Sequence, residues 1–134
     1  MRYYCPECWH DFPQDLSRCP DCGLEIHSYV GEKDYVQKLI VALGHREPET
    51  PIRAAWILGK LGDERAVEPL ISLVSRTQDV YIALAAAEAL AKLRTPRSRR
   101  FLESLARSHP ASMVREAATA ALSDNSERPV ERTA

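Results

Sequence analysis

The chain has 134 residues, of which 45% are hydrophobic and 28% are charged, and its formal net charge at pH 7 is −1. This balance is typical of a folded globular protein and argues against a largely disordered chain. No run approaches the roughly 20 consecutive apolar residues that a membrane-spanning helix needs. Residues 1–5 contain no apolar stretch of the kind found in secretory signal peptides. We therefore expect neither membrane insertion nor export.

The net charge is divided unevenly along the chain. Residues 1–34 hold three basic and seven acidic side chains, a charge of −4, whereas residues 35–134 hold fifteen basic and twelve acidic ones, a charge of +3. A nucleic-acid interface requires a basic patch that faces the phosphates. The N-terminal part is acidic, so nucleic-acid binding through it is not expected.

All four cysteines lie within the first 22 residues and form two Cys-x-x-Cys pairs, Cys5 with Cys8 and Cys19 with Cys22. Each pair can present two thiolates to one metal ion from a tight turn, and two such turns complete a tetrahedron of sulfur ligands. Four protein ligands close the site to substrate, so we predict one structural zinc ion. A redox dithiol pair, two disulfides and a rubredoxin-like iron site are the alternatives. Thiols in metal spacing without an export signal predict a cytoplasmic location.

Residues 1–26 resemble the short zinc-ribbon family, in which each Cys-Pro-x-Cys-Gly turn lies at the tip of a small hairpin. The first turn departs from this pattern, because Trp9 stands where the second turn has Gly23. The resemblance implies a β-hairpin zinc ribbon over residues 1–26, and we assign residues 27–34 to a linker. The apolar residues that stand where such ribbons keep theirs are Tyr4, Phe12, Pro13 and Leu16.

A second pattern begins near residue 35 and repeats with a period of 32 residues. Leu58, Leu90 and Leu122 recur at this interval within similar alanine-rich stretches. Another apolar series lies between them at helical spacing, so each unit is predicted to contain two amphipathic helices. Asp63, Asp79 and Thr95 are suited to cap helix N-termini. Turns are expected at 44–51, 62–65, 76–79, 94–96 and 109–111.

Residues 52–67 and 114–118 are similar to the HEAT-like repeats of phycobilisome lyases. The resemblance implies an α-solenoid, in which stacked helical pairs bury one another's apolar faces. The predicted fold is therefore mostly α, with three HEAT-like helical pairs over residues 35–123 preceded by the ribbon. A non-repeating helical bundle is the alternative. Residues 124–134 have no apolar period and are expected to form a disordered tail.

The sequence contains no arrangement of residues that points to catalysis. None of the four histidines is followed by glutamate, the pair that iron-binding HEAT-repeat hydroxylases use, and His45 and His109 are expected to face solvent in turns. No glycine-rich loop follows a strand, so no phosphate-binding site is visible. We therefore expect a protein without enzymatic activity that acts as a protein–protein adaptor or scaffold.

Partner binding is expected on the concave side of the solenoid, which the second helix of each pair lines. An aromatic residue flanked by cations is a combination enriched among interface hot spots. The expected partner is a protein, and self-association stays open. An accessory role in cofactor or pigment attachment, by analogy with the lyases, is the alternative, and a nucleic-acid-associated ribbon is a weaker one. The predicted partner-binding residues are Arg53, Trp56, Lys60, Tyr81, Glu88 and Lys92.

Overall fold

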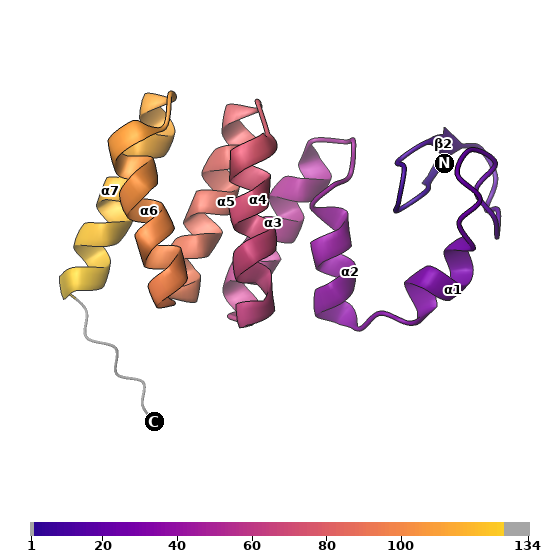
Figure 1. Cartoon of the computed structure of the whole chain (residues 1–134), viewed down its shortest axis with the longest axis horizontal. Helices are drawn as coiled ribbons and strands as arrows, with labels where there is room; N and C mark the ends of the chain where they lie inside the picture. The colour runs from indigo at the N-terminus through magenta and orange to yellow at the C-terminus, as the bar shows by residue number, and fades with distance from the viewer. Residues whose placement is uncertain (1, 128–134) are drawn as a thin grey trace.

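The computed structural model describes residues 2–127, which form a short hairpin followed by a stack of helices (Figure 1). Strands β1 (Tyr3–Tyr4) and β2 (Asp11–Phe12) pair antiparallel, with Tyr3 opposite Phe12. The helices are α1 (Ile26–Gly31), α2 (Tyr35–Ala42), α3 (Glu49–Leu61), α4 (Val67–Arg76), α5 (Val80–Leu93), α6 (Pro96–Ser108) and α7 (Ser112–Glu127), with a 3₁₀ turn, η1 (Glu64–Ala66), before α4.

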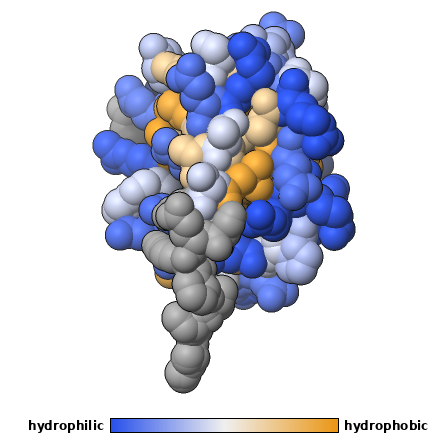
Figure 2. Space-filling view, turned by 90° about the vertical axis from the view of Figure 1, so that its left-hand side faces the viewer, coloured by the Kyte–Doolittle hydropathy of each residue, from blue (hydrophilic) through white to orange (hydrophobic). Residues whose placement is uncertain are grey.

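The helices from α2 onward are arranged as three antiparallel pairs, α2–α3, α4–α5 and α6–α7. Figure 1 shows the first helices of the pairs in one layer and the second helices behind them, so that α5 lies between α3 and α7. This arrangement confirms the predicted mostly α fold and its three-pair solenoid, with a small hairpin at the N-terminal end. No further pair covers α6 and α7 within the described residues, and Figure 2 shows apolar surface between polar side chains on that end.

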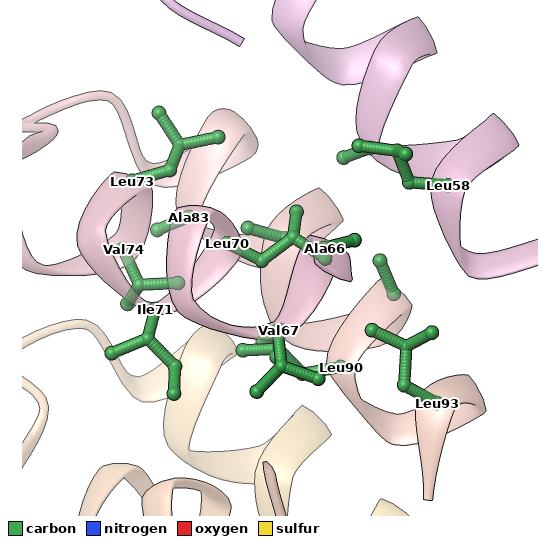
Figure 3. Close-up of a cluster of buried hydrophobic side chains, with 14 of the residues drawn as sticks. Leu58, Ala66, Val67, Leu70, Ile71, Leu73, Val74, Ala83, Leu90 and Leu93 are labelled. Atoms are coloured by element: carbon green, nitrogen blue, oxygen red, sulfur yellow. The ribbon is translucent and has the colours of Figure 1, made fainter. Parts of the chain in front are cut away.

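Leucines of the repeat fill the space between the pairs. Leu58, Leu70 and Leu90 have no exposed surface and belong to one buried cluster that runs through the stack (Figure 3). Alanines and one glycine let the second helices approach closely: a Cβ built on Gly59 of α3 would lie 3.0 Å from the Cα of Ala89 in α5. The 32-residue period therefore corresponds to one layer of the stack, with each leucine repeated in the next layer.

The helix boundaries follow local capping chemistry. Asp79 accepts hydrogen bonds from the backbone N–H groups of Tyr81 and Ile82, and Thr95 forms a capping box with Ser98. Both residues act as the N-caps that the sequence predicts. Asp63 caps the short η1 turn instead of a full helix.

Two of the expected segments, the linker and the tail, contain helix in the structure. Helix α1 occupies most of residues 27–34, the expected linker, because Ile26 is buried in the ribbon and fixes the start of the helix there. Helix α7 continues to Glu127, so residues 124–127 of the expected disordered tail are helical. The remainder of that expected tail, residues 128–134, lies outside the described residues.

Candidate metal centre and interhelical groove

The sulfur atoms of the four cysteines converge on one point in the ribbon. Their sulfur atoms all lie within 4.8 Å of one another, and the Cys5–Cys22 and Cys8–Cys19 sulfur pairs are each 3.7 Å apart. Four thiolates bound to one zinc ion at about 2.3 Å would be separated by about 3.8 Å along each edge of the tetrahedron. The four cysteine side chains are therefore spaced as the ligands of one tetrahedral metal ion would be.

All four cysteines are free, so the two-disulfide alternative does not fit the structure. A sulfur–sulfur bond is about 2.05 Å long, far shorter than the 3.7 Å separations found here. A sulfur tetrahedron suits both zinc and iron, so the geometry leaves the choice between these two ions open. The four cysteine sulfur atoms thus lie within metal-binding distance of one another, an arrangement consistent with a metal site.

The backbone of each cysteine turn supports the first sulfur of its pair. The N–H of Glu7 donates to the Cys5 sulfur at 3.4 Å, and the N–H of Asp21 donates to the Cys19 sulfur at 3.3 Å. Cys5 and Cys19 are buried, whereas Cys8 and Cys22 are exposed. The backbone N–H of Cys22, and then that of Asp21, lowers the pKa of Cys19 to about 7 against the opposing effect of burial. At Cys19 this environment favours the thiolate, the form that binds metal. At Cys8 and Cys22, hydrogen bonds from the backbone of His10 and Leu24 act in the same direction, but burial and the neighbouring cysteine side chains raise the pKa of both thiols.

The two cysteine turns share one backbone conformation despite their different sequences. Trp9 and Gly23 each follow the first cysteine of their pair by four residues, and both have positive φ, 63° and 80°. Their N–H groups donate to the carbonyl oxygens of Cys5 and Cys19 at 2.8 and 3.0 Å. Glycine adopts this conformation freely, whereas a residue with a Cβ does so at a cost of about 1–2 kcal/mol. The first turn therefore carries backbone strain that the second does not.

The side chain of Trp9 explains how that strain is offset. Its indole ring packs against Gly44, where a Cβ would lie only 3.0 Å from Nε1, and against the His45 ring at a centroid distance of 5.1 Å. Arg46 donates from its guanidinium to the Trp9 carbonyl oxygen at 2.8 Å. These partners all lie in the turn between α2 and α3. Trp9 therefore joins the ribbon to the first helical pair.

Tyr4 completes this joint from the neighbouring strand. Its ring meets the edge of the His45 ring at a centroid distance of 4.3 Å, and its hydroxyl donates to Glu47 at 2.9 Å. His45 is therefore half-buried between two aromatic rings, and the expectation that it faces solvent in a turn is wrong. Burial lowers the pKa of His45, with Glu47 opposing the shift. Glycine at position 44 is one sequence signal of this contact, because any larger residue would displace Trp9.

A second feature is a groove of about 600 Å³ between α3 and α5. Trp56 forms one side of it and is 59% exposed, which is unusual for the largest apolar side chain. The Lys60 ammonium lies over the Trp56 ring, 5.0 Å from its centroid. The groove is formed by the second helices of two successive pairs, which is the surface on which partner binding is expected from the sequence.

Four of the six predicted partner-binding residues line this groove: Arg53, Trp56, Glu88 and Lys92. Lys60 lies beside it on Trp56, whereas Tyr81 is 64% exposed on α5 but is outside the groove lining. Sequence reasoning missed the apolar part of the lining, which consists of Ile52, Ala85 and Ala89. Ala85 and Ala89 are spaced i, i+4 on one face of α5, a signal that could have identified the shallow wall opposite Trp56.

Comparison with protein families gives a match to HEAT repeats over residues 36–123. The chain belongs to the HEAT-repeat family. The match covers the three helical pairs and leaves the ribbon outside it. A search of curated proteins gave no match. HEAT repeats commonly mediate protein–protein interaction. Within residues 2–127, none of the helices has both the length and the apolar character needed to cross a membrane.

Proposed function

We propose that this protein is a non-enzymatic adaptor whose HEAT-repeat groove binds a partner protein and whose ribbon is held by one structural zinc ion. The observation that carries the proposal is the exposed Trp56 at the side of the α3–α5 groove. Covering an aromatic side chain of this size yields on the order of 2 kcal/mol, which is enough for one residue to act as a hot spot.

The groove has the composition of an interface rather than of a catalytic cleft. Its apolar lining residues lie next to an aromatic ring, and its charged residues, Arg53, Glu88 and Lys92, stand at the surface. Interfaces typically combine an apolar centre with aromatic and arginine anchors and a polar rim. None of the groove residues is a histidine, serine or cysteine placed beside a base, the arrangement that nucleophilic catalysis needs.

Zinc is the ion we propose for the cysteine site, and its role is structural. Four thiolates leave no open coordination position for a substrate, which is the arrangement of structural rather than catalytic zinc. The ribbon has a buried apolar cluster of only four residues, too few to fold it without a metal. Thiols kept free for metal binding require a reducing compartment, and we propose the cytoplasm.

Site-specific photocrosslinking tests the adaptor function and does not require that the partner be identified first. A photoreactive phenylalanine analogue replaces Glu88 in the groove, and a matched control places it at Arg76, an exposed position on α4. Irradiation of the cells that contain the protein should give a discrete protein adduct from position 88 and not from position 76. The adduct should disappear when Trp56→Ala is added to the position 88 variant.

Two outcomes would contradict the proposal. Equal adducts from positions 88 and 76 would mean that the groove has no preferred partner. A small-molecule adduct at position 88, with no protein attached, would favour the accessory role in cofactor or pigment attachment that the phycobilisome-lyase resemblance suggests. A melting curve of Trp56→Ala belongs to the test, because an unfolded variant would lose the adduct for a different reason.

A further inference from the structure

We infer that the α3–α5 groove selects an acidic segment of its partner, in which one apolar side chain packs beside Trp56 and acidic side chains lie on both sides of it. The inference rests on the proposed function and deepens it by naming the chemistry of the partner. It follows from the charges that surround Trp56, from the pairing state of those charges and from the spacing between them.

Positive charge predominates around the groove. Arg53 and Lys60 flank Trp56 on α3, and Lys92 lies on the facing helix α5, whereas Glu88 is the one acidic residue among the groove residues. Three cations against one carboxylate leave this surface with a charge of +2, although the whole chain has a net charge of −1. A complementary partner surface is therefore acidic.

These cations are not used to hold the solenoid together. Within the described residues, Arg53, Lys60 and Lys92 form no ion pair, although Lys60 contacts the Trp56 ring. Arginines that connect elements of the fold do have carboxylate partners: Arg65 bridges Asp34 and Asp63, and Arg97 joins α6 to Glu68 of α4. The groove cations are thus available for carboxylates supplied by another chain.

The spacing of the cations indicates the length of the segment. Lys60 follows Arg53 by seven residues, which corresponds to a rise of about 10 Å along α3. An extended peptide advances by about 3.3 Å per residue and covers this distance in about three residues. An acidic residue at each end and an apolar residue near the middle would therefore match Arg53, Trp56 and Lys60 in order.

The apolar lining limits what the central residue can be. Ile52, Ala85 and Ala89 form the apolar part of the lining, in the same groove of about 600 Å³ as the Trp56 ring. Glu88 also lies in the lining and would repel an acidic side chain at this central position. The central residue is therefore apolar, and leucine or phenylalanine would give the largest buried area.

Binding of designed peptides tests the inference directly. The probe is a nine-residue peptide with a central leucine, two glutamates on each side and serines elsewhere; its matched controls carry lysines in place of the glutamates or a serine in place of the leucine. The chain contains only two tryptophans, Trp9 in the ribbon joint and Trp56 in the groove, so the two indole N–H signals in an NMR spectrum separate groove binding from effects on the ribbon. Trp56→Phe assigns the signals.

The acidic leucine peptide should shift the Trp56 signal in a saturable manner and leave Trp9 unchanged. Either control peptide should bind at least tenfold more weakly, and affinity for the acidic peptide should fall as salt is added. A double variant with Lys60→Glu and Lys92→Glu should bind the acidic peptide at least tenfold more weakly. The double variant with Lys60→Gln and Lys92→Gln should have an affinity between that of the wild type and that of the glutamate variant. Arg76→Glu and Arg107→Glu, exposed cations on α4 and α6, should leave the affinity unchanged.

Three results would overturn the inference. Equal or tighter binding of the lysine peptide would exclude selection for acidic segments. Absence of binding by every peptide, with the crosslinked protein adduct at position 88 still present, would show that the adaptor function holds and that its partner has another chemistry. A single-stranded RNA oligonucleotide that shifts Trp56 at lower concentration than the acidic peptide would assign the cations to phosphates instead.

Discussion

The two cysteine turns of the ribbon share a backbone hydrogen bond and a left-handed conformation at the same position, yet they differ in what surrounds them. The second turn ends on Gly23, which has no heavy atom within 4 Å of a Cβ position and faces open space. The first turn ends on Trp9, which is strained but packs on the α2–α3 turn. The comparison shows that a metal-binding turn can accept an unfavourable residue when its side chain connects two parts of the molecule.

This difference connects the cysteine site to the solenoid. A metal ion held by the four sulfurs would fix the first turn, the turn fixes the direction of the Trp9 ring, and the ring contacts Gly44 and His45 just before α3 begins. Helix α3 carries Trp56 on its exposed side. The ribbon is therefore attached to the helical pair that forms half of the groove, rather than tethered to it by the chain alone.

Removal of the metal is the perturbation with the largest expected effect on both turns. Structural zinc provides roughly 10–16 kcal/mol of apparent binding energy in zinc-finger peptides, so a chelator should unfold the ribbon. The solenoid has its own buried core and should keep its helical circular-dichroism signal. The Trp9 indole signal should move to an unfolded position, whereas the Trp56 signal should change little.

Elemental analysis gives the control for this experiment. We expect one zinc ion per chain in protein purified under reducing conditions, and Cys19→Ser should lower that content and reproduce the effect of the chelator. Loss of the helical signal in parallel with the metal would show that the solenoid depends on the ribbon, contrary to the comparison. Finding no metal at all would reject the four-sulfur site.

Trp9→Ala should have the next largest effect, because it keeps the strained backbone and removes the ring. The half-buried indole contributes about 2 kcal/mol through its contacts with Gly44 and His45. Since folding of the ribbon is coupled to metal binding, this loss should appear as an affinity for zinc about 30-fold lower. A competition titration with a chromogenic chelator measures it. An unchanged affinity would mean that the ring contacts do not stabilise the ribbon.

The sequence predicts the solenoid and the convergence of the four cysteines well because both are encoded by short, regular spacing. Each layer of the stack repeats the same contacts 32 residues later, so the period itself indicates that Leu58 and Leu90 have equivalent environments. The joint between ribbon and solenoid has no such period. It depends on Trp9 meeting residues about 35 positions away. The sequence signals of this contact are two single residues: Trp9, which stands where the second turn has glycine, and Gly44, on which the Trp9 ring packs.

The α3–α5 groove could be predicted from the sequence only in part. The residues Arg53, Trp56, Glu88 and Lys92 could be assigned to one surface from helical spacing and the repeat, because α3 and α5 are equivalent helices. Whether Trp56 was exposed or packed could not be decided in this way, since its exposure depends on how closely α5 approaches. The close contact of Gly59 with Ala89 sets that distance, and the neighbouring helix leaves the ring 59% exposed.

Substitutions at the two left-handed positions, 9 and 23, should change the zinc affinity by a smaller factor and separate backbone strain from the ring contacts. Gly23→Ala should lower zinc affinity about fivefold, because the turn acquires strain of about 1 kcal/mol without any new contact. Trp9→Gly should bind zinc about fivefold more tightly than Trp9→Ala, because it removes the same ring and also relieves the strain. Equal affinities for the two Trp9 variants would show that φ at position 9 is not strained.

The smallest expected effect is a pH dependence of the zinc affinity that arises at His45, which packs against the first cysteine turn. Burial between Tyr4 and Trp9 lowers the pKa of His45 below its ordinary value of about 6.5. His45 therefore binds a proton more readily when the ribbon is unfolded than when it is docked. The contribution of His45 to docking is fully present above about pH 6.5 and decreases as the pH falls from there toward the folded pKa. Protons also compete with zinc for the thiolates, which weakens metal binding in every variant.

His45→Gln isolates the histidine contribution, because glutamine does not titrate while its side chain can still accept a hydrogen bond. Zinc affinity of the wild-type protein should fall more steeply between pH 7 and 5.5 than that of His45→Gln, and Gly23→Ala should show the wild-type slope because its change lies in the turn that has no contact with His45. Identical slopes for wild type and His45→Gln would mean that His45 is protonated as easily with the ribbon docked as with the ribbon unfolded, and that the joint is open to solvent.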